Sequence, residues 1–234
     1  AMNYNMKKFL STVSDMRKKF NKTKEITVYK RKLDLESDQV AIDRLVKIIR
    51  NEKQEYEEKE NRAIKDAKKF HEKCKASASF KVLRSSDSKV EMKIIHLNGE
   101  GLATGIAKAV VDASVEECAA ERFHLESRKK KGEMKKEGIT QLVVKKINDH
   151  SVYYITTREL GYGLNPREGR SKVTWMKGEG GKVIVDVSDT KDVMEEYPVK
   201  DGNVLASAHT VWIFEPLDSI GKIPQTAVSF TARI

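Results

Sequence analysis

The chain has 234 residues, which is enough for one sizeable core or for one domain with an appendage. Charged residues make up 34% of it, and no window approaches the roughly 18 apolar residues of a membrane helix, which excludes an integral membrane protein of that kind. Residues 1–80 carry a net charge of +8, whereas residues 81–234 carry only +2. Because a nucleic-acid binder spreads a basic face over its fold, this uneven distribution argues against that class.

Residues 1–36 have the pattern of a basic amphipathic helical segment. The apolar positions recur at helical spacing: Met6, Phe9, Leu10, Val13, Met16 and Phe20. Basic residues occupy other positions, and with Phe9 they are the candidates for docking: Lys7, Lys8, Arg17, Lys18 and Lys19. Two interpretations remain open for this segment. It docks on an anionic membrane surface or a partner, or it packs on its own or a neighbouring domain.

Residues 37–76 predict one long charged helix. Five apolar or small residues follow each other at intervals of seven: Ile42, Ile49, Tyr56, Ala63 and Phe70. No Gly or Pro interrupts the run, and the charged positions between these residues favour a half-solvated helix over a coiled coil. His71 and Cys74 lie one turn apart, but no second pair accompanies them at zinc spacing, so no metal site is expected.

From residue 77 onwards the hydrophobic period changes from 3.6 to 2, which indicates strands. The expected strands span 79–84, 90–96, 104–112, 139–147, 152–160, 172–176, 183–187, 204–214 and 226–234. Ser114 and Glu117 form a capping box that opens a helix through Phe123, and 128–136 reads as a solvated helix. The predicted class is α+β with a large curved antiparallel sheet.

The sequence contains no phosphate loop, nucleophile elbow or zinc-protease motif, so we expect no cofactor and no catalytic residue. Two cysteines are too few for a disulfide scaffold, and no secretory signal is visible, so we expect a cytoplasmic protein with peripheral membrane contact as an option.

Four stretches within 77–234 resemble a START domain, the lipid transfer module related to the steroidogenic acute regulatory protein. They are Val-Asp-Ala-Ser-Val-Glu-Glu at 111–117, Ile-Asn-Asp-His-Ser-Val-Tyr-Tyr at 147–154, Asn-Pro-Arg-Glu at 165–168 with Val-Thr-Trp at 173–175, and Pro-Gln-Thr-Ala-Val-Ser-Phe at 224–230. The segment before residue 77 resembles the linkers of large algal or protist proteins with repeated START-like domains, through residues 9–10, 14–18 and 20.

The resemblance implies a helix-grip fold, in which a curved sheet wraps a C-terminal helix around an apolar tunnel for one lipid or sterol. Glu159 matches an inward acidic position of the family, and we expect it either to face water or to bind a ligand hydroxyl. The candidate cavity residues are Tyr153, Ile155, Thr157, Glu159, Val173, Trp175 and His209.

The chain also departs from the family pattern. Glu168 and Gly169 replace an Asp-Phe pair, and Val173 stands where the family has the basic partner of its internal ion pair. The sequence stops at Ile234, where the last strand of the family ends, so the C-terminal helix is missing. Three explanations stay open: the chain is a fragment, a neighbouring copy or domain supplies the helix, or the 37–76 helix fills the groove.

The leading hypothesis is a non-catalytic lipid- or sterol-binding module for transfer or sensing, docked through its basic N-terminal helix. The alternative is a degenerate START-like regulatory or protein-interaction domain without lipid binding. A third hypothesis, an enzyme of the wider superfamily, depends on His209 meeting Tyr154 or Glu159 inside the cavity. No nucleic-acid partner is expected.

Overall fold

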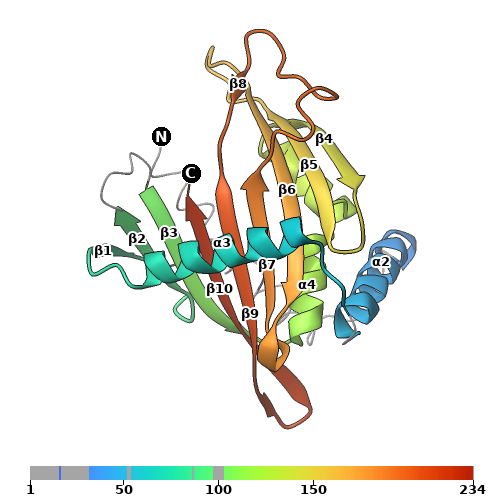
Figure 1. Cartoon of the computed structure of the whole chain (residues 1–234), viewed down its shortest axis with the longest axis vertical. Coiled ribbons are helices and arrows are strands. Elements are labelled where there is room, and N and C mark those ends of the chain that lie inside the picture. The colour runs from blue at the N-terminus through green and yellow to red at the C-terminus, as the bar shows by residue number, and fades with distance from the viewer. Residues whose placement is uncertain (1–15, 17–31, 52–53, 86, 97–102, 234) are drawn as a thin grey trace.

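The computed structural model describes residues 16, 32–51, 54–85, 87–96 and 103–233, which form one curved sheet with helices on both faces (Figure 1). The helices described are α2 (Lys32–Arg50), α3 (Glu58–Lys75), α4 (Val115–Phe123) and α5 (Arg128–Lys136). The strands are β1 (Phe80–Leu83), β2 (Glu91–His96), β3 (Ala103–Val111), β4 (Ile139–Lys146), β5 (Ser151–Arg158), β6 (Arg167–Lys177), β7 (Val183–Asp189), β8 (Val204–Leu205), β9 (His209–Ile220) and β10 (Ile223–Arg233). The predicted α+β class is confirmed.

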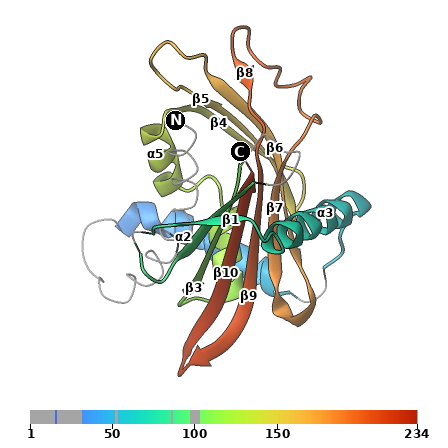
Figure 2. The same ribbon diagram turned by 90° about the vertical axis from the view of Figure 1, so that its left-hand side faces the viewer.

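The strands follow each other in the sheet as β1-β2-β3-β10-β9-β7-β6-β5-β4, and β8 pairs with the start of β6. All neighbours are antiparallel except β6 and β8. The last strand, β10, pairs with β3 and so joins the first three strands to the rest of the sheet. Figure 2 shows the sheet curving around α4 and α5, with α2 on that side and α3 on the opposite side. We call these two sides the inner face and the outer face.

The inner face carries the main core. Helix α4 begins at the predicted capping box: Ser114 Oγ accepts from the Glu117 N–H, and the Glu117 carboxylate accepts from the Ser114 N–H. Its buried residues pack on the apolar side chains of β6, β7, β9 and β10, while Val46 and Ile49 of α2 and Met16 join the same cluster. Helices α2 and α4 together therefore cover the inner face.

The outer face is covered by α3, whose residues Ile64 and Ala67 pack on Ile184, Val211 and Ile213 of β7 and β9. Two turns further along, Cys74 packs against Ile95 of β2 and Ile106 of β3. His71 is buried as well, and its Nδ1 lies 2.8 Å from Thr231 Oγ1 of β10. His71 and Cys74 are therefore core residues.

The prediction of a single helix over 37–76 is wrong, because the chain leaves the helix after Arg50 and re-enters it at Glu58. Glu57 adopts an extended conformation and forms a capping box with Glu60, which starts α3. Gln54 Nε2 donates to the Ile48 carbonyl at 2.7 Å and so satisfies a carbonyl at the end of α2. The break lets the two halves cover opposite faces of one sheet.

Two strand predictions also differ from the structure. Strand β6 starts at Arg167 instead of 172, because the polar residues before 172 hide a paired strand. The predicted strand 204–214 is divided into β8 and β9. Between them the Ala206 N–H donates to the Glu168 carbonyl and the Ala208 N–H to Asp189 Oδ1, so the backbone leaves the ladder there.

Candidate ligand-binding site

Strand register divides the predicted cavity residues between the two faces of the sheet. Seven residues are expected to line a common cavity: Tyr153, Ile155, Thr157, Glu159, Val173, Trp175 and His209. Val173 and Trp175 belong to the inner-face core, and Val152 pairs with Val173. Because successive residues of a strand point to opposite faces, Tyr153, Ile155 and Thr157 face outward. The expectation that all seven residues line one cavity is therefore wrong, because Val173 and Trp175 face inward.

The outward-facing residues make contacts on the outer face. Tyr153 donates its hydroxyl hydrogen to Asp192 Oδ2 at 3.1 Å. His209 Nε2 lies 2.8 Å from Asp186 Oδ1, and its ring stacks on Phe70 of α3 with centroids 4.5 Å apart. Tyr153 therefore links the segment after β7 to the sheet, and His209 packs α3 against it.

Glu159 lies just beyond the end of β5 and is exposed. Its N–H donates to the Gly138 carbonyl at 2.8 Å. The carboxylate therefore faces water, which is one of the two alternatives expected for it. His209 on the outer face, Tyr154 on the inner face and the exposed Glu159 do not meet, so the structure does not assemble the cluster on which the enzyme hypothesis depends.

The part of the inner face beneath α4 is a closed aromatic core made of Trp175, Trp212, Phe214 and Phe230. These four side chains are at most 1% exposed. The Trp212 ring lies 4.3 Å from the Phe230 ring and 6.1 Å from the Phe214 ring, between centroids. A side chain that lines a water-sized cavity keeps accessible surface, so this aromatic core lines none.

The inner face is more accessible where β4, β5 and the start of β6 meet. Leu142 and Val144 on β4 and Tyr154 and Thr156 on β5 share this face by register, and all four are only partly buried. We call these four residues the β4–β6 inner surface. The β6 residue opposite Tyr154 is the small Ser171, so this end has less side-chain volume than the aromatic core. This end of the inner face therefore keeps partly accessible apolar side chains.

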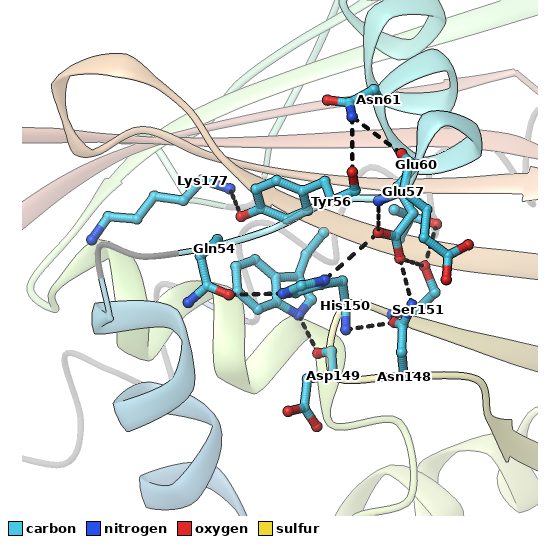
Figure 3. Close-up of polar contacts among 12 residues, drawn as sticks. Gln54, Tyr56, Glu57, Glu60, Asn61, Asn148, Asp149, His150, Ser151 and Lys177 are labelled. Atoms are coloured by element: carbon cyan, nitrogen blue, oxygen red, sulfur yellow. Dashed lines mark hydrogen bonds and ion pairs between the residues drawn. The ribbon is translucent and has the colours of Figure 1, made fainter.

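A second cluster lies where the linker between α2 and α3 crosses the β4–β5 turn (Figure 3). The Glu60 carboxylate has no exposed surface and accepts from the Ser151 hydroxyl at 2.6 Å, from Asn148 Nδ2 at 3.0 Å and from the Glu57 N–H at 2.9 Å. His150 Nδ1 lies 3.6 Å from the same carboxylate. We call these residues the linker cluster.

Aromatic rings complete the linker cluster. The His150 ring lies 4.5 Å from the Tyr56 ring and 5.0 Å from the Trp175 ring, between centroids, and its Nε2 is 2.7 Å from Gln54 Oε1 (Figure 3). The Tyr56 hydroxyl accepts from the Lys177 N–H at 2.8 Å. An open pocket of about 790 Å³ adjoins this cluster, lined largely by carboxylates and amides.

The hydrogen bonds of the linker cluster have a structural role. Burial alone would raise the pKa of Glu60, but the hydrogen bonds from Ser151, Asn148 and Glu57, together with His150, outweigh it and hold the pKa below its usual value. Ser151 donates to the carboxylate and is itself fully buried, so its hydroxyl is not poised as a nucleophile beside a base.

Among the described residues, no group of three or more His, Cys, Asp and Glu side chains is arranged to hold a metal ion. Cys74 and Cys118 are free thiols and both are buried. No helix in the described part of the chain is long and apolar enough to cross a membrane. The predicted docking residues all lie outside the described residues: Lys7, Lys8, Phe9, Arg17, Lys18 and Lys19.

The fold is START-like. The lipid transfer and protein localization domain of human StarD13 has a TM-score of 0.50 and 15% identity over 77% of this chain and 83% of its own. Human STARD10 has a TM-score of 0.56 and 15% identity over 80% and 71%, and human StAR-related lipid transfer protein 5 has 0.55 and 17% over 73% and 79%. No protein-family model and no curated protein matches the sequence. The predicted helix-grip architecture is confirmed.

Sequence reasoning missed the residues that anchor this grip. Glu60 was one charge among many in a charged segment, and only its pairing with Glu57 at capping-box spacing could have marked a helix start there. Arg122 was not among the predicted site residues, although its place in the last turn of α4 brings it over the inner face.

Proposed function

We propose that this protein is a non-catalytic module that binds a lipid or sterol on the inner face of its START-like grip, for transfer or sensing. The observation that carries the proposal is the β4–β6 inner surface, which keeps apolar side chains partly accessible beside the closed aromatic core. Burial of an apolar ligand there would drive binding at about 25 cal/mol for each Å² of apolar surface.

The arrangement of the helices supports this location. Helix α2, the first half of the predicted long helix, packs on α4 on the inner face, in line with the idea that this segment contributes to filling the groove. It leaves Leu142 and Val144 of β4 partly accessible. A ligand would therefore lie between this part of the sheet and the neighbouring helices.

Lipid extraction from purified protein, followed by mass spectrometry, tests the proposal. Val144→Trp adds bulk to the β4–β6 inner surface and is expected to lower the lipid-to-protein ratio. Val143→Trp is the matched control, because it adds the same bulk on the opposite face of the same strand. A protein that carries no lipid and also ignores fluorescent sterols and phospholipids would contradict the proposal, as would equal lipid loss in both variants.

The membrane-docking role of the N-terminal segment is part of the same proposal and rests on sequence. Its basic residues would contact anionic headgroups while Phe9 enters the interface. Co-sedimentation with phosphatidylserine vesicles and with neutral vesicles tests it. Replacing Lys7, Lys8, Arg17, Lys18 and Lys19 with Gln should abolish the preference for anionic vesicles; an unchanged preference would refute the docking role.

The alternative is a START-like regulatory or protein-interaction domain that binds no lipid. It is favoured by the aromatic core, where Trp175 and Phe214 have no exposed surface and so leave no room for a ligand. The lipid analysis above separates the two functions. A protein that is purified without lipid, and whose Tm does not change when lipids are added, would favour the alternative.

A further inference from the structure

One basic side chain on the inner face, Arg122, has no anionic hydrogen-bond partner among the residues that the structure describes. Arg122 lies in the last turn of α4, and its guanidinium carbon sits over the Trp212 ring of β9, 5.2 Å from the centroid. Arg122 Nε is buried, and no described residue accepts a hydrogen bond from it. The side chain as a whole is only partly buried, so some of it faces open space.

The charges around Arg122 do not neutralise it. The carboxylate of Glu121 attracts the Arg122 guanidinium electrostatically. The same carboxylate also lies 3.9 Å from Lys130 Nζ, so two cations share one negative charge. Tyr154 of the β4–β6 inner surface is the other neighbour, and burial raises the pKa of its phenol, so it stays neutral. Burial lowers the pKa of Arg122, the direction expected when a cation is removed from water without a matching anion.

Two more polar atoms on this face lack a partner among the described residues. Trp212 Nε1, an N–H donor in the ring beneath Arg122, is buried and unpaired, and so is Thr210 Oγ1. Thr210 precedes Trp212 by two residues on β9 and therefore points to the same face. Native proteins rarely leave buried donors unpaired, so three such groups on one face call for an explanation.

We propose that Arg122 binds the carboxylate or phosphate group of an anionic lipid whose apolar chain lies along the β4–β6 inner surface. A guanidinium can donate two parallel hydrogen bonds to such a group. Its charge and these donors select an anion over a neutral or cationic headgroup. Tyr154 connects the two parts, because it belongs to the β4–β6 inner surface and lies near Arg122.

The experiment compares ligands that differ in charge or in chain. Delipidated full-length protein is titrated with oleate, with oleyl alcohol, and with inorganic phosphate or acetate, and binding is followed by calorimetry. Wild-type protein should bind oleate about tenfold to a hundredfold more tightly than oleyl alcohol, the range expected for hydrogen bonds to a charged group. The small anions, which lack a chain, should bind far more weakly than oleate.

Arg122→Gln should remove the preference for oleate while leaving the affinity for oleyl alcohol unchanged. Arg62→Gln is the matched control, since it removes the same charge from an exposed position on α3, on the outer face. Arg122→Lys keeps the charge but loses the two parallel donors of the guanidinium, so it should lower oleate affinity severalfold, and it provides a second test should Arg122→Gln fail to fold.

The inference rests on the proposed function, and the outcomes separate the two. Equal binding of oleate and oleyl alcohol by wild-type protein, or an oleate preference that survives Arg122→Gln, overturns the anion site and leaves lipid binding standing. Phosphate or acetate binding as tight as oleate, and lost in Arg122→Gln, overturns the lipid as the source of the anion. Binding of none of the chain-bearing ligands overturns the proposed function itself.

Discussion

Glu60→Gln is expected to destabilise the protein strongly although it changes only one atom of a side chain. The buried carboxylate accepts three hydrogen bonds, from Ser151, Asn148 and the Glu57 N–H. The amide of Gln keeps one acceptor oxygen, but its NH2 group replaces the other oxygen and would face one of these three donors. Hydrogen bonds to a charged group contribute about 1.5–3 kcal/mol each, so we expect a loss of about 2–3 kcal/mol.

For a chain of this length, each kcal/mol corresponds to about 2–4 °C in Tm, so Glu60→Gln should lower Tm by roughly 4–12 °C. Differential scanning calorimetry and urea titration measure it. Glu58→Gln is the control, because Glu58 is exposed in the same helical turn and its replacement should cost no more than about 0.5 kcal/mol. Equal Tm values for the two variants would refute the assignment of Glu60 as the anchor of the linker cluster.

The same carboxylate predicts a dependence of stability on pH. The pKa of Glu60 in the folded protein is lowered, so the folded state holds the ionised form more tightly than the unfolded state does. The contribution to stability is therefore complete above the unfolded pKa of about 4.3 and is lost as pH falls through the folded pKa. Tm should fall more steeply below this pH in wild type than in Glu60→Gln; parallel curves would contradict the sign.

Three further substitutions test other parts of the fold by urea denaturation. Ile49→Ala removes a fully buried contact of α2 and should cost about 2–5 kcal/mol; a negligible loss would show that α2 does not pack on the inner face in solution. Arg170→Gln leaves the buried Glu168 without its ion-pair partner, which should cost about 3–5 kcal/mol, and a neutral result would contradict that pairing. Ser114→Ala removes the α4 cap and should cost about 1 kcal/mol, whereas no change would mean that the cap contributes nothing.

Local signals in the sequence located most elements of the fold. The Ser114 capping box and the period-2 strands are visible because capping and alternation each leave a mark within a few residues. The break before α3 left only the capping-box spacing of Glu57 and Glu60, which does not stand out in a charged segment, and neither Gly nor Pro occurs there. It is stabilised by partners far along the chain, such as the Lys177 N–H, which donates a hydrogen bond to the Tyr56 hydroxyl.

The site was harder to predict than the fold, because β5 carries apolar residues on both faces. Val152 and Tyr154 pack inward while Ile155 is buried on the outer side, so hydrophobicity alone could not show which set faces the grip. Only the pairing of Val152 with Val173 decides it. The sequence is equally unable to show that Arg122 Nε donates to no described residue, because this depends on which groups the fold brings within hydrogen-bonding distance.

The linker cluster also bears on how a ligand would reach the inner face. The Trp175 ring belongs to the aromatic core, and its Nε1 donates to the Asp149 carbonyl at 2.9 Å. Tyr56 packs edge-on against the same indole, with centroids 6.2 Å apart. The linker after α2 is therefore fastened to the core itself, and displacing that end of α2 would break contacts of Glu60, Tyr56 and Trp175 together. A route past β4 and β5, where Val144 is already accessible, breaks none of them. We therefore expect Glu60→Gln to loosen α2 without changing the chemistry of the β4–β6 inner surface.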